Sequence, residues 1–498
     1  MSRMPVPMRP ERMAVPRLRV PAVESALAQA LRQIRENLEL PDSFPAPVER
    51  EAEQRARDVA LPDLDLEHIP FITIDPAGST DLDQAMHLER AGEGYRVHYA
   101  IADVPTFVLP ASALDTEARQ RGQTIYAPDG RIPLHPLVIS EGAASLLPEQ
   151  VRSAFVWTFE LDAHANVTTN TLQRARIRSR RRYSYTEVQS DLDSGQAPES
   201  LRLLEEIGLK RVALEEQRGG ASLNRPDEEV TLKDGVYSLE RRVPLPVEQF
   251  NAQISLMTGM AAAQLMLEGR VGILRTMPAP FADTLEVFRR RVAALGHPWP
   301  AGQPYGEYLH SLDQSDPKAA AVTRAAASLF RGAGYTAFDG DVPPNMIQAA
   351  VAAPYSHTTA PIRRLVDRFV LVACEALANG HPVPAWVREA LPTLPKLMGH
   401  SNGVASRLEQ ASVDAIEAAL LSSRVGDVFE AVVVDVRNGG GIIQLTEPVV
   451  TATIEGPVTA GEVVAAQLIS ADISTGTVMF TLSGRPETPG GSGAAVRA

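Results

Sequence analysis

The segment Phe71-Ile-Thr-Ile-Asp75-Pro-Ala-Gly-Ser-Thr-Asp81-Leu-Asp83-Gln-Ala-Met86 joins a β-forming run to a turn that is rich in aspartate. The run ends in Asp75, turn-forming residues follow, and Asp81 and Asp83 stand two positions apart. Three carboxylates this close repel one another unless cations lie between them. Mg²⁺ prefers oxygen ligands and typically takes one or two carboxylates together with substrate phosphates. The segment therefore indicates metal-assisted phosphoryl transfer, in which metal ions hold the attacking and leaving oxygens.

Two other interpretations of this segment compete with the metal site. Asp and Ser are common in solvated turns because their side chains hydrogen-bond to the local backbone. A calcium loop would need a glycine at its sixth position and a glutamate at its twelfth. Counted from Asp75, these positions hold Thr80 and Met86, so the calcium loop is excluded. The local pattern leaves the solvated turn and the metal site both open.

The length and composition of the chain predict a multidomain globular protein. At 498 residues, roughly two to four domains are expected. The single cysteine, Cys374, excludes an internal disulfide and a cysteine-rich zinc site, and it favours a reducing compartment. No apolar run reaches the length of a membrane span, and the N-terminal residues lack the apolar core of a signal peptide. A cytoplasmic location without membrane contact is therefore expected.

The charge of the chain is acidic overall but locally basic. A net charge of −13 argues against indiscriminate coating of nucleic acid. Residues 174–182 nevertheless contain six arginines in nine positions. On a strand, Arg174, Arg176, Arg178 and Arg180 would share one face, because side chains alternate. This face is interpreted either as a stripe that contacts phosphates or as a solvated, positively charged edge strand.

The pattern along the chain predicts an α+β fold with four parts. Residues 1–65 show helical periodicity after a Pro/Arg-rich start, which indicates a small, mainly helical N-terminal module. Residues 66–422 begin with strands and continue with helical segments, which favours a mixed sheet surrounded by helices over alternating βαβ units. The helical segments are expected at 200–217, 247–268, 281–295, 317–331, 361–378 and 402–422. Residues 423–484 contain five short strand patterns, typical of a small barrel, and residues 485–498 form a Gly/Ser/Pro-rich tail that is expected to be disordered.

A second informative segment runs from Pro354 to Asp367 and reads PYSHTTAPIRRLVD. Pro361 lies close to the predicted start of an apolar helix, where proline is favoured. Arg363 and Arg364 would project from the first turn of that helix, where positive charge opposes the helix dipole unless an anion is nearby. The pair indicates a phosphate site; the alternative is an arginine pair that forms a salt bridge with Asp367.

These segments resemble those of the ribonuclease II/RNase R family, which is defined by the RNB catalytic domain. The aspartate segment resembles the family pattern of a β-run, Ile-Asp, five residues and then Asp-x-Asp-Asp. Further blocks follow in the family's order: His98-Tyr-Ala-Ile-Ala-Asp103-Val, Leu114 to Pro128, Tyr183-Ser-Tyr185-Thr-Glu187, Pro246-Val-Glu248-Gln-Phe250 and Pro354 to Asp367. The likeness runs from about residue 66 to residue 420, and the predicted barrel resembles the family's S1-type OB-fold domain. A single block is weak, but their shared order is highly specific.

The resemblance implies a hydrolytic, processive 3′→5′ exoribonuclease that degrades single-stranded RNA to 5′-mononucleotides. It implies one or two Mg²⁺ ions, with Mn²⁺ as a substitute, and no organic cofactor; we also expect a monomer. By position, Asp75, Asp81 and Asp83 correspond to three of the family's four acidic site residues, and Asp83 corresponds to the most activity-critical one. The fourth position holds Gln84. Its side chain offers a neutral oxygen ligand without charge, so weaker metal binding is expected.

The same resemblance implies roles for five further side chains. Arg363 corresponds to the arginine that contacts the scissile phosphate, and Arg364 would support the neighbouring RNA backbone. Tyr126 corresponds to the tyrosine that stacks on the 3′-terminal base, and Tyr185 to a second aromatic residue of the RNA path. Glu409 resembles a late-helix glutamate near the leaving nucleotide. Without the resemblance, Tyr126 would be interpreted as a half-buried core tyrosine and Glu409 as part of a solvated helix face.

The sequence departs from the family pattern at both ends. The family usually places two cold-shock OB-folds before the catalytic domain, whereas residues 1–65 are too few for two barrels and have a helical pattern. The predicted C-terminal barrel has Phe429 and Phe480 as its aromatic residues, so weak RNA binding is expected, because OB-folds usually stack bases on aromatics. Two other functions stay open. Gln84 prompts a non-catalytic RNA-binding protein on an RNB scaffold, and the aspartates also suit another metal phosphodiesterase or phosphatase.

Overall fold

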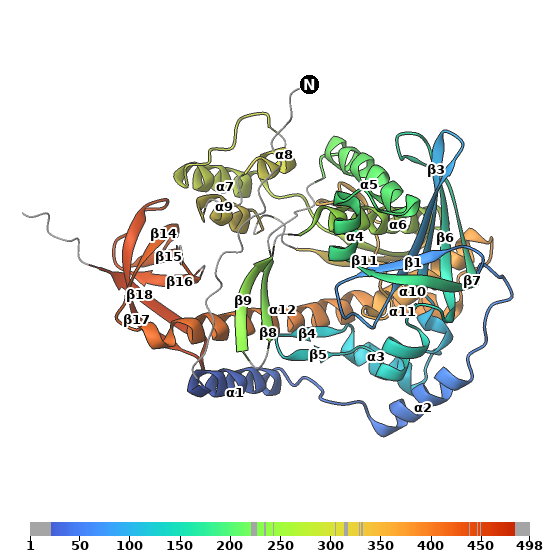
Figure 1. Cartoon of the computed structure of the whole chain (residues 1–498), viewed down its shortest axis with the longest axis horizontal. Coiled ribbons are helices and arrows are strands. Elements are labelled where there is room, and N and C mark those ends of the chain that lie inside the picture. Colours follow the sequence, from blue (N-terminus) through green and yellow to red (C-terminus); the bar gives the residue numbers. More distant parts are fainter. Residues whose placement is uncertain are drawn as a thin grey trace, which may run out of the picture.

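Residues 21–483 are described by the computed structural model, with gaps at 221–226, 234–235, 243, 304, 313–316, 328, 330–331, 438, 446 and 449. The predicted tail at 485–498 and the first twenty residues of the predicted N-terminal module lie outside the described residues. Figure 1 shows a larger core of strands and helices and a smaller barrel, with the long helix α12 (Leu394–Leu421) reaching from one to the other.

A closed five-stranded barrel forms the centre of the larger core. Its strands, in order around the barrel, are β1 (Phe71–Asp75), β2 (Gln84–Ala91), β3 (Gly94–Ala102), β6 (Val151–Leu161) and β7 (Val167–Ser184). Strands β1 and β7 pair in parallel and the other neighbours are antiparallel. Alternate residues of β6, Phe155, Trp157 and Phe159, are fully buried, as expected of a strand whose inner face is apolar. The mixed sheet and the surrounding helices confirm the predicted α+β class.

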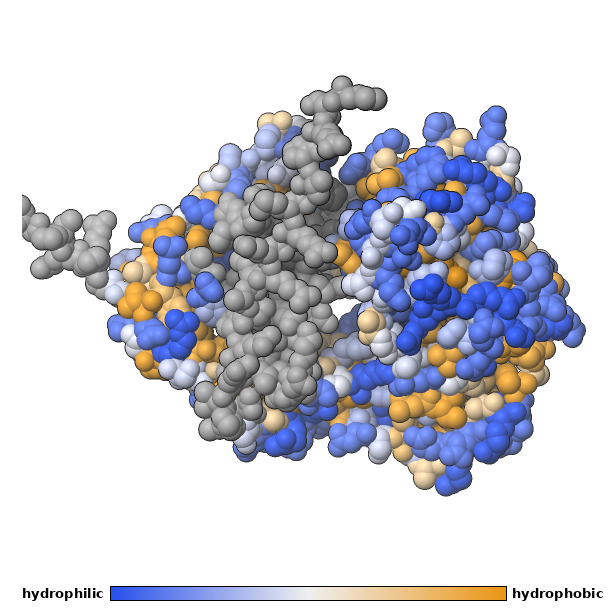
Figure 2. Space-filling view, in the orientation of Figure 1, coloured by the Kyte–Doolittle hydropathy of each residue, from blue (hydrophilic) through white to orange (hydrophobic). Residues whose placement is uncertain are grey.

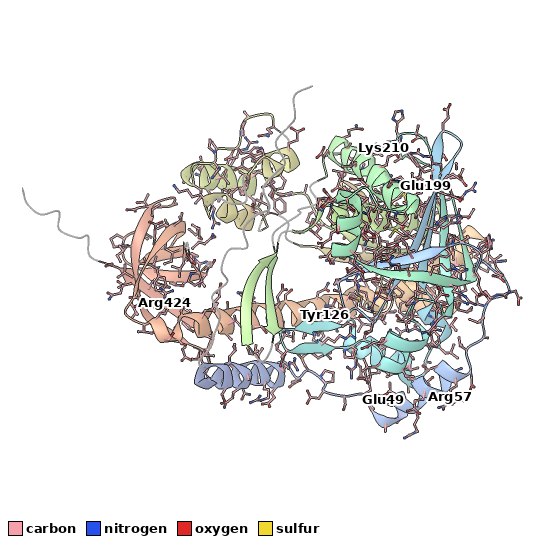
Figure 3. The ribbon with its side chains drawn as sticks, in the orientation of Figure 1. Glu49, Arg57, Tyr126, Glu199, Lys210 and Arg424 are labelled. Atoms are coloured by element: carbon pink, nitrogen blue, oxygen red, sulfur yellow. The ribbon has the colours of Figure 1, made fainter. Side chains whose placement is uncertain are left out.

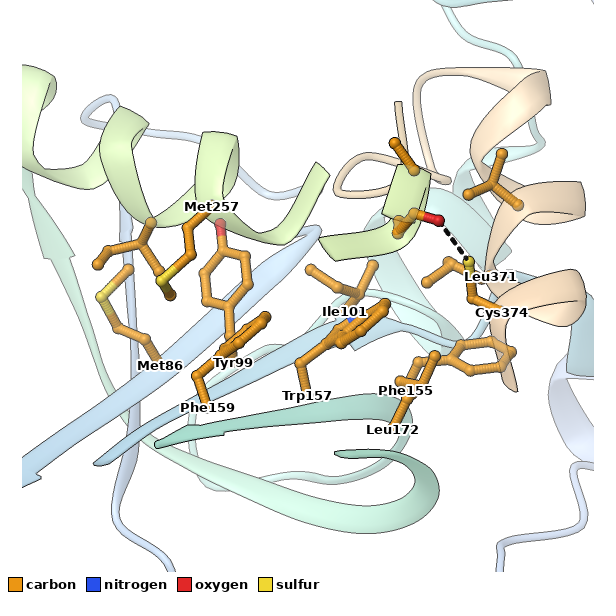
Figure 4. Close-up of a cluster of buried hydrophobic side chains, with 14 of the residues drawn as sticks. Met86, Tyr99, Ile101, Phe155, Trp157, Phe159, Leu172, Met257, Leu371 and Cys374 are labelled. Atoms are coloured by element: carbon orange, nitrogen blue, oxygen red, sulfur yellow. Dashed lines mark hydrogen bonds between the residues drawn. The ribbon is translucent and has the colours of Figure 1, made fainter. Parts of the chain in front are cut away.

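Helices cover this barrel and bury its apolar side chains. They are α3 (Ala113–Arg121), α4 (Tyr185–Asp193), α5 (Glu199–Gln217), α6 (Pro246–Gly269), α10 (Leu365–Ala378) and α11 (Ala385–Ala390). Figure 4 shows Tyr99 and Trp157 of the barrel near Met257 of α6 and Leu371 of α10. Each large apolar side chain that is fully buried contributes about 1.5–3 kcal/mol. These contacts fix the barrel against the helices that cover it.

Short strands and turns of helix complete the core. The paired strands are β4 (Ile125–Ala127) with β5 (Gly130–Ile132), β8 (Asp227–Lys233) with β9 (Val236–Arg242), β10 (Val271–Thr276) with β11 (Gly334–Asp339) and β12 (Ile347–Gln348) with β13 (Ala353–Pro354). The single helical turns are Val104–Thr106, Val138–Ala143, Leu391–Thr393 and Ser422–Arg424. The hairpin of β4 and β5 lies against α12, through a cluster that includes Ile125, Ile132 and Leu408.

Two predicted helix starts are wrong. Helix α10 begins at Leu365 rather than at Pro361, because Arg364 has an extended backbone (φ −134°, ψ 126°) and residues 361–364 form a turn. Arg363 and Arg364 therefore precede the helix instead of projecting from its first turn. Helix α12 begins at Leu394 rather than at residue 402, because a proline in its first turn is compatible with helix geometry.

The N-terminal helices pack on two separate parts of the molecule. Helix α1 (Pro21–Asn37) lies along α12, where its Leu27 and Leu31 share a buried cluster with Ile416. Helix α2 (Ala46–Arg57) instead packs on the five-stranded barrel of the larger core, where its Val48 and Ala52 share a buried cluster with Phe71 of β1. The two helices have no cluster in common among the described residues, so each depends on the core that it covers.

The smaller barrel closes in the order β14-β15-β16-β18-β17. Its strands are β14 (Val428–Arg437), β15 (Gly440–Leu445), β16 (Thr451–Glu455), β17 (Val463–Asp472) and β18 (Thr477–Leu482). Phe429 and Phe480 are buried inside it and meet edge to face, so neither ring is exposed to stack on a base. Helices α7 (Ala282–Ala294), α8 (Tyr305–His310) and α9 (Pro317–Ala327) pack against β14 through Val432 and Val434. None of the described helices is both long and apolar enough to cross a membrane.

Candidate active site

The aspartate segment lies where β1 ends and β2 begins. Asp75 is the last residue of β1, and its backbone pairs with Ser184 at the end of β7. The connecting loop is fixed by Ser145, whose hydroxyl accepts the Leu82 N–H (2.9 Å) and donates to the carbonyl oxygen of Thr80 (2.7 Å). The loop that carries the carboxylates is therefore held by the fold rather than solvated.

Asp83 is buried and meets the turn before α10. Its Oδ1 accepts the Ile362 N–H (2.8 Å), and its Oδ2 lies 3.4 Å from Nε of Arg363. Burial raises the pKa of Asp83 to about 8, against the opposing effects of Arg363 and the Ile362 amide. The two informative segments of the sequence are thus brought into contact at this carboxylate.

Asp75 and Asp81 lie in different electrostatic surroundings. Burial raises the pKa of Asp75 to about 7, and the negative charge of Asp81 raises it further, while Arg363 opposes both effects. Asp81 instead pairs with Arg131 of β5, whose Nη1 is 2.8 Å from its Oδ1. Arg131 also pairs with Glu141. Sequence reasoning missed Arg131, because nothing in the short β4–β5 hairpin shows that its side chain reaches the aspartate loop.

The donor set of Asp75, Asp81 and Asp83 fits a hard divalent cation by its chemistry. Asp83 is buried and Asp75 is half-buried, the pKa values of both are raised, and all the donors are oxygens, so a cation would stabilise the charged form of these carboxyls. Arg131 and Arg363 lie beside Asp81 and Asp83 in the present arrangement. Within the described part of the chain, no three His, Cys, Asp or Glu side chains are placed so that they could hold a metal.

Gln84 uses both ends of its side-chain amide in hydrogen bonds within the protein. Its Nε2 donates to the carbonyl oxygen of Thr359 (2.7 Å), and its Oε1 accepts the hydroxyl proton of Tyr99. Tyr99 is fully buried on β3. The predicted role of Gln84 as a metal ligand would therefore have to coexist with the Tyr99 hydrogen bond on the same oxygen.

The two neighbouring arginines have different partners. Arg364 forms a two-pronged ion pair with the buried Asp367, with distances of 3.0 and 2.8 Å. Asp367 also accepts the Ala360 N–H (2.7 Å), so this pair shapes the turn that precedes α10. The salt-bridge interpretation therefore holds for Arg364, whereas Arg363 is directed to Asp83 and remains 46% exposed. Contact between Arg364 and the RNA backbone stays a prediction.

Tyr126 is exposed on the β4–β5 hairpin, with 55% of its surface accessible, so it is not a core tyrosine. Figure 3 shows it beside α12. The chain that leads into the hairpin is tied to the arginine turn, because the Thr124 N–H donates to the carbonyl oxygen of Arg363 (2.9 Å). An exposed ring next to the proposed phosphate contact suits a base that stacks.

Tyr185 and Glu409 lie in contrasting positions. Tyr185 begins α4, and its hydroxyl accepts a hydrogen bond from Asn251 (2.9 Å). The residue before Tyr185, Ser184, pairs with Asp75, so Tyr185 follows a residue that lies beside the start of the aspartate loop. Burial raises the pKa of Tyr185 to about 12, and the charge of Asp75 contributes. Glu409 is exposed on α12, as expected of a residue on a solvated helix face. Its predicted role near the leaving nucleotide stays untested.

The arginines of β7 share one face, as predicted, but each has an acidic partner. Arg174 pairs with Asp103 (3.1 Å), Arg176 with Asp65 (2.9 Å) and Arg178 with Glu67 (2.9 Å). The edge-strand interpretation is wrong, because β7 lies between β6 and β1 in a closed barrel. In Figure 2 the core surface is strongly hydrophilic where β1 and β7 run in Figure 1. An RNA phosphate could reach the three arginines only by competing with these carboxylates, so their predicted RNA contact stays a prediction.

Comparison with known protein families identifies two regions of the chain. Residues 63–379 match the RNB domain, and residues 427–483 match the RNase II-type exonuclease C-terminal S1 domain. Because the first match covers more than half of the 498 residues, the chain belongs to the RNB family.

Individual relatives include bacterial and plant proteins. Ribonuclease R of Escherichia coli is 26% identical over 448 residues, which cover 82% of this chain and 53% of the relative. The exosome complex exonuclease RRP44 homolog A of Arabidopsis thaliana is 28% identical over 414 residues, which cover 79% of this chain and 43% of the relative. The chain thus spans about half the length of the curated relatives that it matches.

Solved structures share the fold. Mycoplasma genitalium RNase R in complex with ribose methylated single-stranded RNA aligns with a TM-score of 0.81 at 20% identity, over 92% of this chain and 78% of that one. Yeast Ssd1, described as a pseudonuclease, aligns with a TM-score of 0.65 at 15% identity, over 90% of this chain and 57% of that one. The same fold is therefore found in a protein described as a ribonuclease and in one described as a pseudonuclease.

Proposed function

We propose that this protein is a Mg²⁺-dependent exoribonuclease that hydrolyses single-stranded RNA processively from the 3′ end and releases 5′-mononucleotides. The observation that carries this proposal is the contact between Asp83 and Arg363, which joins the carboxylate loop to the only arginine of the pair that is still exposed. Membership of the RNB family and similarity to ribonuclease R support the proposal.

The side chains around Asp83 divide the work of hydrolysis between them. Asp75, Asp81 and Asp83 would hold Mg²⁺, which supplies charge stabilisation at the phosphate when it is bound. Arg363 donates hydrogen bonds to the scissile phosphate and stabilises the negative charge that develops on it. Tyr126 stacks on the terminal base, a contact that tolerates every base and typically contributes ~1–3 kcal/mol.

The proposal extends to the wider properties of the enzyme. Preference for RNA over DNA would come from contacts to the 2′-hydroxyl groups. We assign most of the RNA affinity to the core, because residues 427–483 contain Arg437 as their single Lys or Arg and bury both aromatic rings. We further propose that the protein is a monomer and that it also accepts Mn²⁺. We propose a cytoplasmic location as well, because the free, buried thiol of Cys374 suits a reducing compartment.

An RNA degradation assay tests this function. Single-stranded RNA labelled at its 5′ end is incubated with the protein and Mg²⁺. We expect processive shortening to a limit product of a few nucleotides. Labelled fragments of intermediate length that arise from internal cuts would contradict exonucleolytic action.

A nuclease-inactive RNA-binding protein is the second candidate, and Gln84 favours it. Gln84 is neutral where the family pattern has an acidic residue, and its amide group is hydrogen-bonded to Tyr99 and Thr359. Tight binding of RNA that stays intact in the degradation assay would support this candidate. Release of inorganic phosphate from phosphorylated substrates, without RNA shortening, would instead indicate a different phosphatase.

Replacement of Tyr126 by Ala is expected to change the end of digestion. Loss of the stacked base should weaken binding of the shortest products by about tenfold or more, so the limit product becomes longer. The products are measured on a sequencing gel. Phe281→Ala is the matched control, since Phe281 is also an exposed aromatic residue (77%) but lies at the start of α7. Identical limit products of Tyr126→Ala and the wild type would exclude stacking at this position.

Mg²⁺ binding is expected to tighten as the pH rises from about 6 to about 9, because protons on Asp75 and Asp83 compete with the metal up to pH values near their raised pKa values, about 7 and about 8. The same shifts predict that the metal-free protein loses stability as the pH rises from about 4 through this range, since the unfolded carboxyls ionise first. Calorimetric Mg²⁺ titration at several pH values measures the first effect. A dissociation constant that does not change with pH would contradict the prediction, and Asp83→Asn should flatten the dependence.

A further inference from the structure

Gln84 belongs to a chain of hydrogen bonds that joins four parts of the core. Its oxygen accepts from Tyr99 of β3, and its nitrogen donates to the carbonyl oxygen of Thr359 in the segment before α10. The hydroxyl groups of Thr359 and of Ser255 on α6 are 2.8 Å apart. Thr359 and Tyr99 are both buried. Water therefore cannot easily take the place of a lost partner, and loss of one of these hydrogen bonds would destabilise the fold.

The amide of Gln84 matches the chemistry of the network, because it is hydrogen-bonded at both its oxygen and its nitrogen. A carboxamide donates through its nitrogen and accepts through its oxygen at the same time, whereas an ionised carboxylate only accepts. An ionised carboxylate here would satisfy the Tyr99 hydroxyl but would face the lone pairs of the Thr359 carbonyl oxygen. The neutral amide is therefore the group that fits between these two partners.

Gln84 and its neighbour Asp83 hold the same turn at two points. Gln84 binds the carbonyl oxygen of Thr359, and Asp83 binds the N–H of Ile362. Arg363 follows directly, and its Nε lies 3.4 Å from Asp83. Two adjacent residues at the start of β2 thus fix the backbone from which the exposed arginine extends.

We propose that Gln84 is a positioning residue, which acts through the Thr359–Ile362 turn to place Arg363 against the scissile phosphate, and that it is not a metal ligand. The proposal rests on the exoribonuclease function proposed above. At position 84, an amide that binds the backbone of the Thr359–Ile362 turn thus stands where the family pattern has a negative charge.

Gln84→Met in the full chain tests the proposal, because methionine keeps the length and neutrality of the side chain but removes both hydrogen bonds. We expect faster amide hydrogen exchange at residues 360–363. We expect the dissociation constant of Mn²⁺, used as the metal probe, to stay within about twofold of the wild type, because no ligand has been removed. The kcat on RNA should fall by about tenfold with little change in KM, because Arg363 acts on charge that develops in the transition state.

Tyr99→Phe is a milder second variant, since it removes only the hydroxyl that donates to Gln84; we expect the same changes at smaller size. In an Arg363→Ala background, Gln84→Met should lower kcat no further. Weaker Mn²⁺ binding with unchanged exchange at residues 360–363 would overturn the proposal and make Gln84 a ligand. Unchanged exchange and unchanged kcat would overturn it as well. If the wild type does not shorten RNA, the proposed function fails, while the exchange and Mn²⁺ measurements still decide the role of Gln84.

Discussion

Asp83→Asn is expected to stop RNA degradation, with a loss in rate on the order of 10³-fold or more. Asn keeps the shape of the side chain and can still accept the Ile362 N–H through its oxygen. It removes the charge that attracts both the metal and Arg363. The rate is measured as shortening of 5′-labelled RNA under single-turnover conditions.

The folded state of this variant should be at least as stable as that of the metal-free wild type near pH 8. Burial raises the pKa of Asp83 to about 8, so ionisation of this carboxyl opposes folding at higher pH, and Asn removes that cost. Asp339→Asn is the matched control, because Asp339 also pairs with an arginine, Arg388, but on an exposed surface. Retained activity in Asp83→Asn, or equal losses in both variants, would contradict a catalytic role for Asp83.

Arg363→Ala is expected to lower kcat on the order of 10²-fold while KM changes much less, because the guanidinium stabilises charge that is present mainly in the transition state. Its exposed fraction (46%) leaves it free to reach a phosphate, although Nε lies near Asp83. The two constants are obtained from initial rates over a range of RNA concentrations.

Arg388→Ala provides the control for charge and exposure. Arg388 is 47% exposed and pairs with Asp339, so its loss removes one surface arginine of the same kind. A surface ion pair contributes only about 0–1 kcal/mol, so this variant should behave like the wild type. A rise in KM without a change in kcat for Arg363→Ala would mean that Arg363 only binds RNA.

The sequence was sufficient to predict which chain segments meet, but not how individual side chains pair. The order of the blocks placed Asp83 and Arg363 at one site, and the structure brings them to 3.4 Å. Arg363 and Arg364 are identical residues in one segment, and only the turn before α10 directs one to Asp83 and the other to Asp367. Such a difference depends on backbone direction, which residue types alone do not encode.

Partners supplied by distant segments were also beyond sequence reasoning. The run of arginines on β7 was interpreted without Asp65 and Glu67, which lie more than a hundred residues earlier and pair with Arg176 and Arg178. Gln84 was interpreted from its own chemistry as a weaker ligand, because nothing in the sequence shows that Tyr99 and Thr359 enclose its amide. In both cases the sequence shows the charged or amide side chain, but its ion-pair or hydrogen-bond partner depends on the fold.

Hydrolysis from the 3′ end is tested most directly with single-stranded RNA that carries a label in its 3′-terminal nucleotide. The protein is mixed with this RNA and Mg²⁺, and the labelled products are separated at the earliest time points. We predict that the label appears first and almost entirely as a 5′-mononucleotide, and that Asp83→Asn releases none. Label that stays in long fragments while the RNA is consumed, or label that is never released by the wild type, would contradict 3′→5′ exonucleolytic hydrolysis at this site.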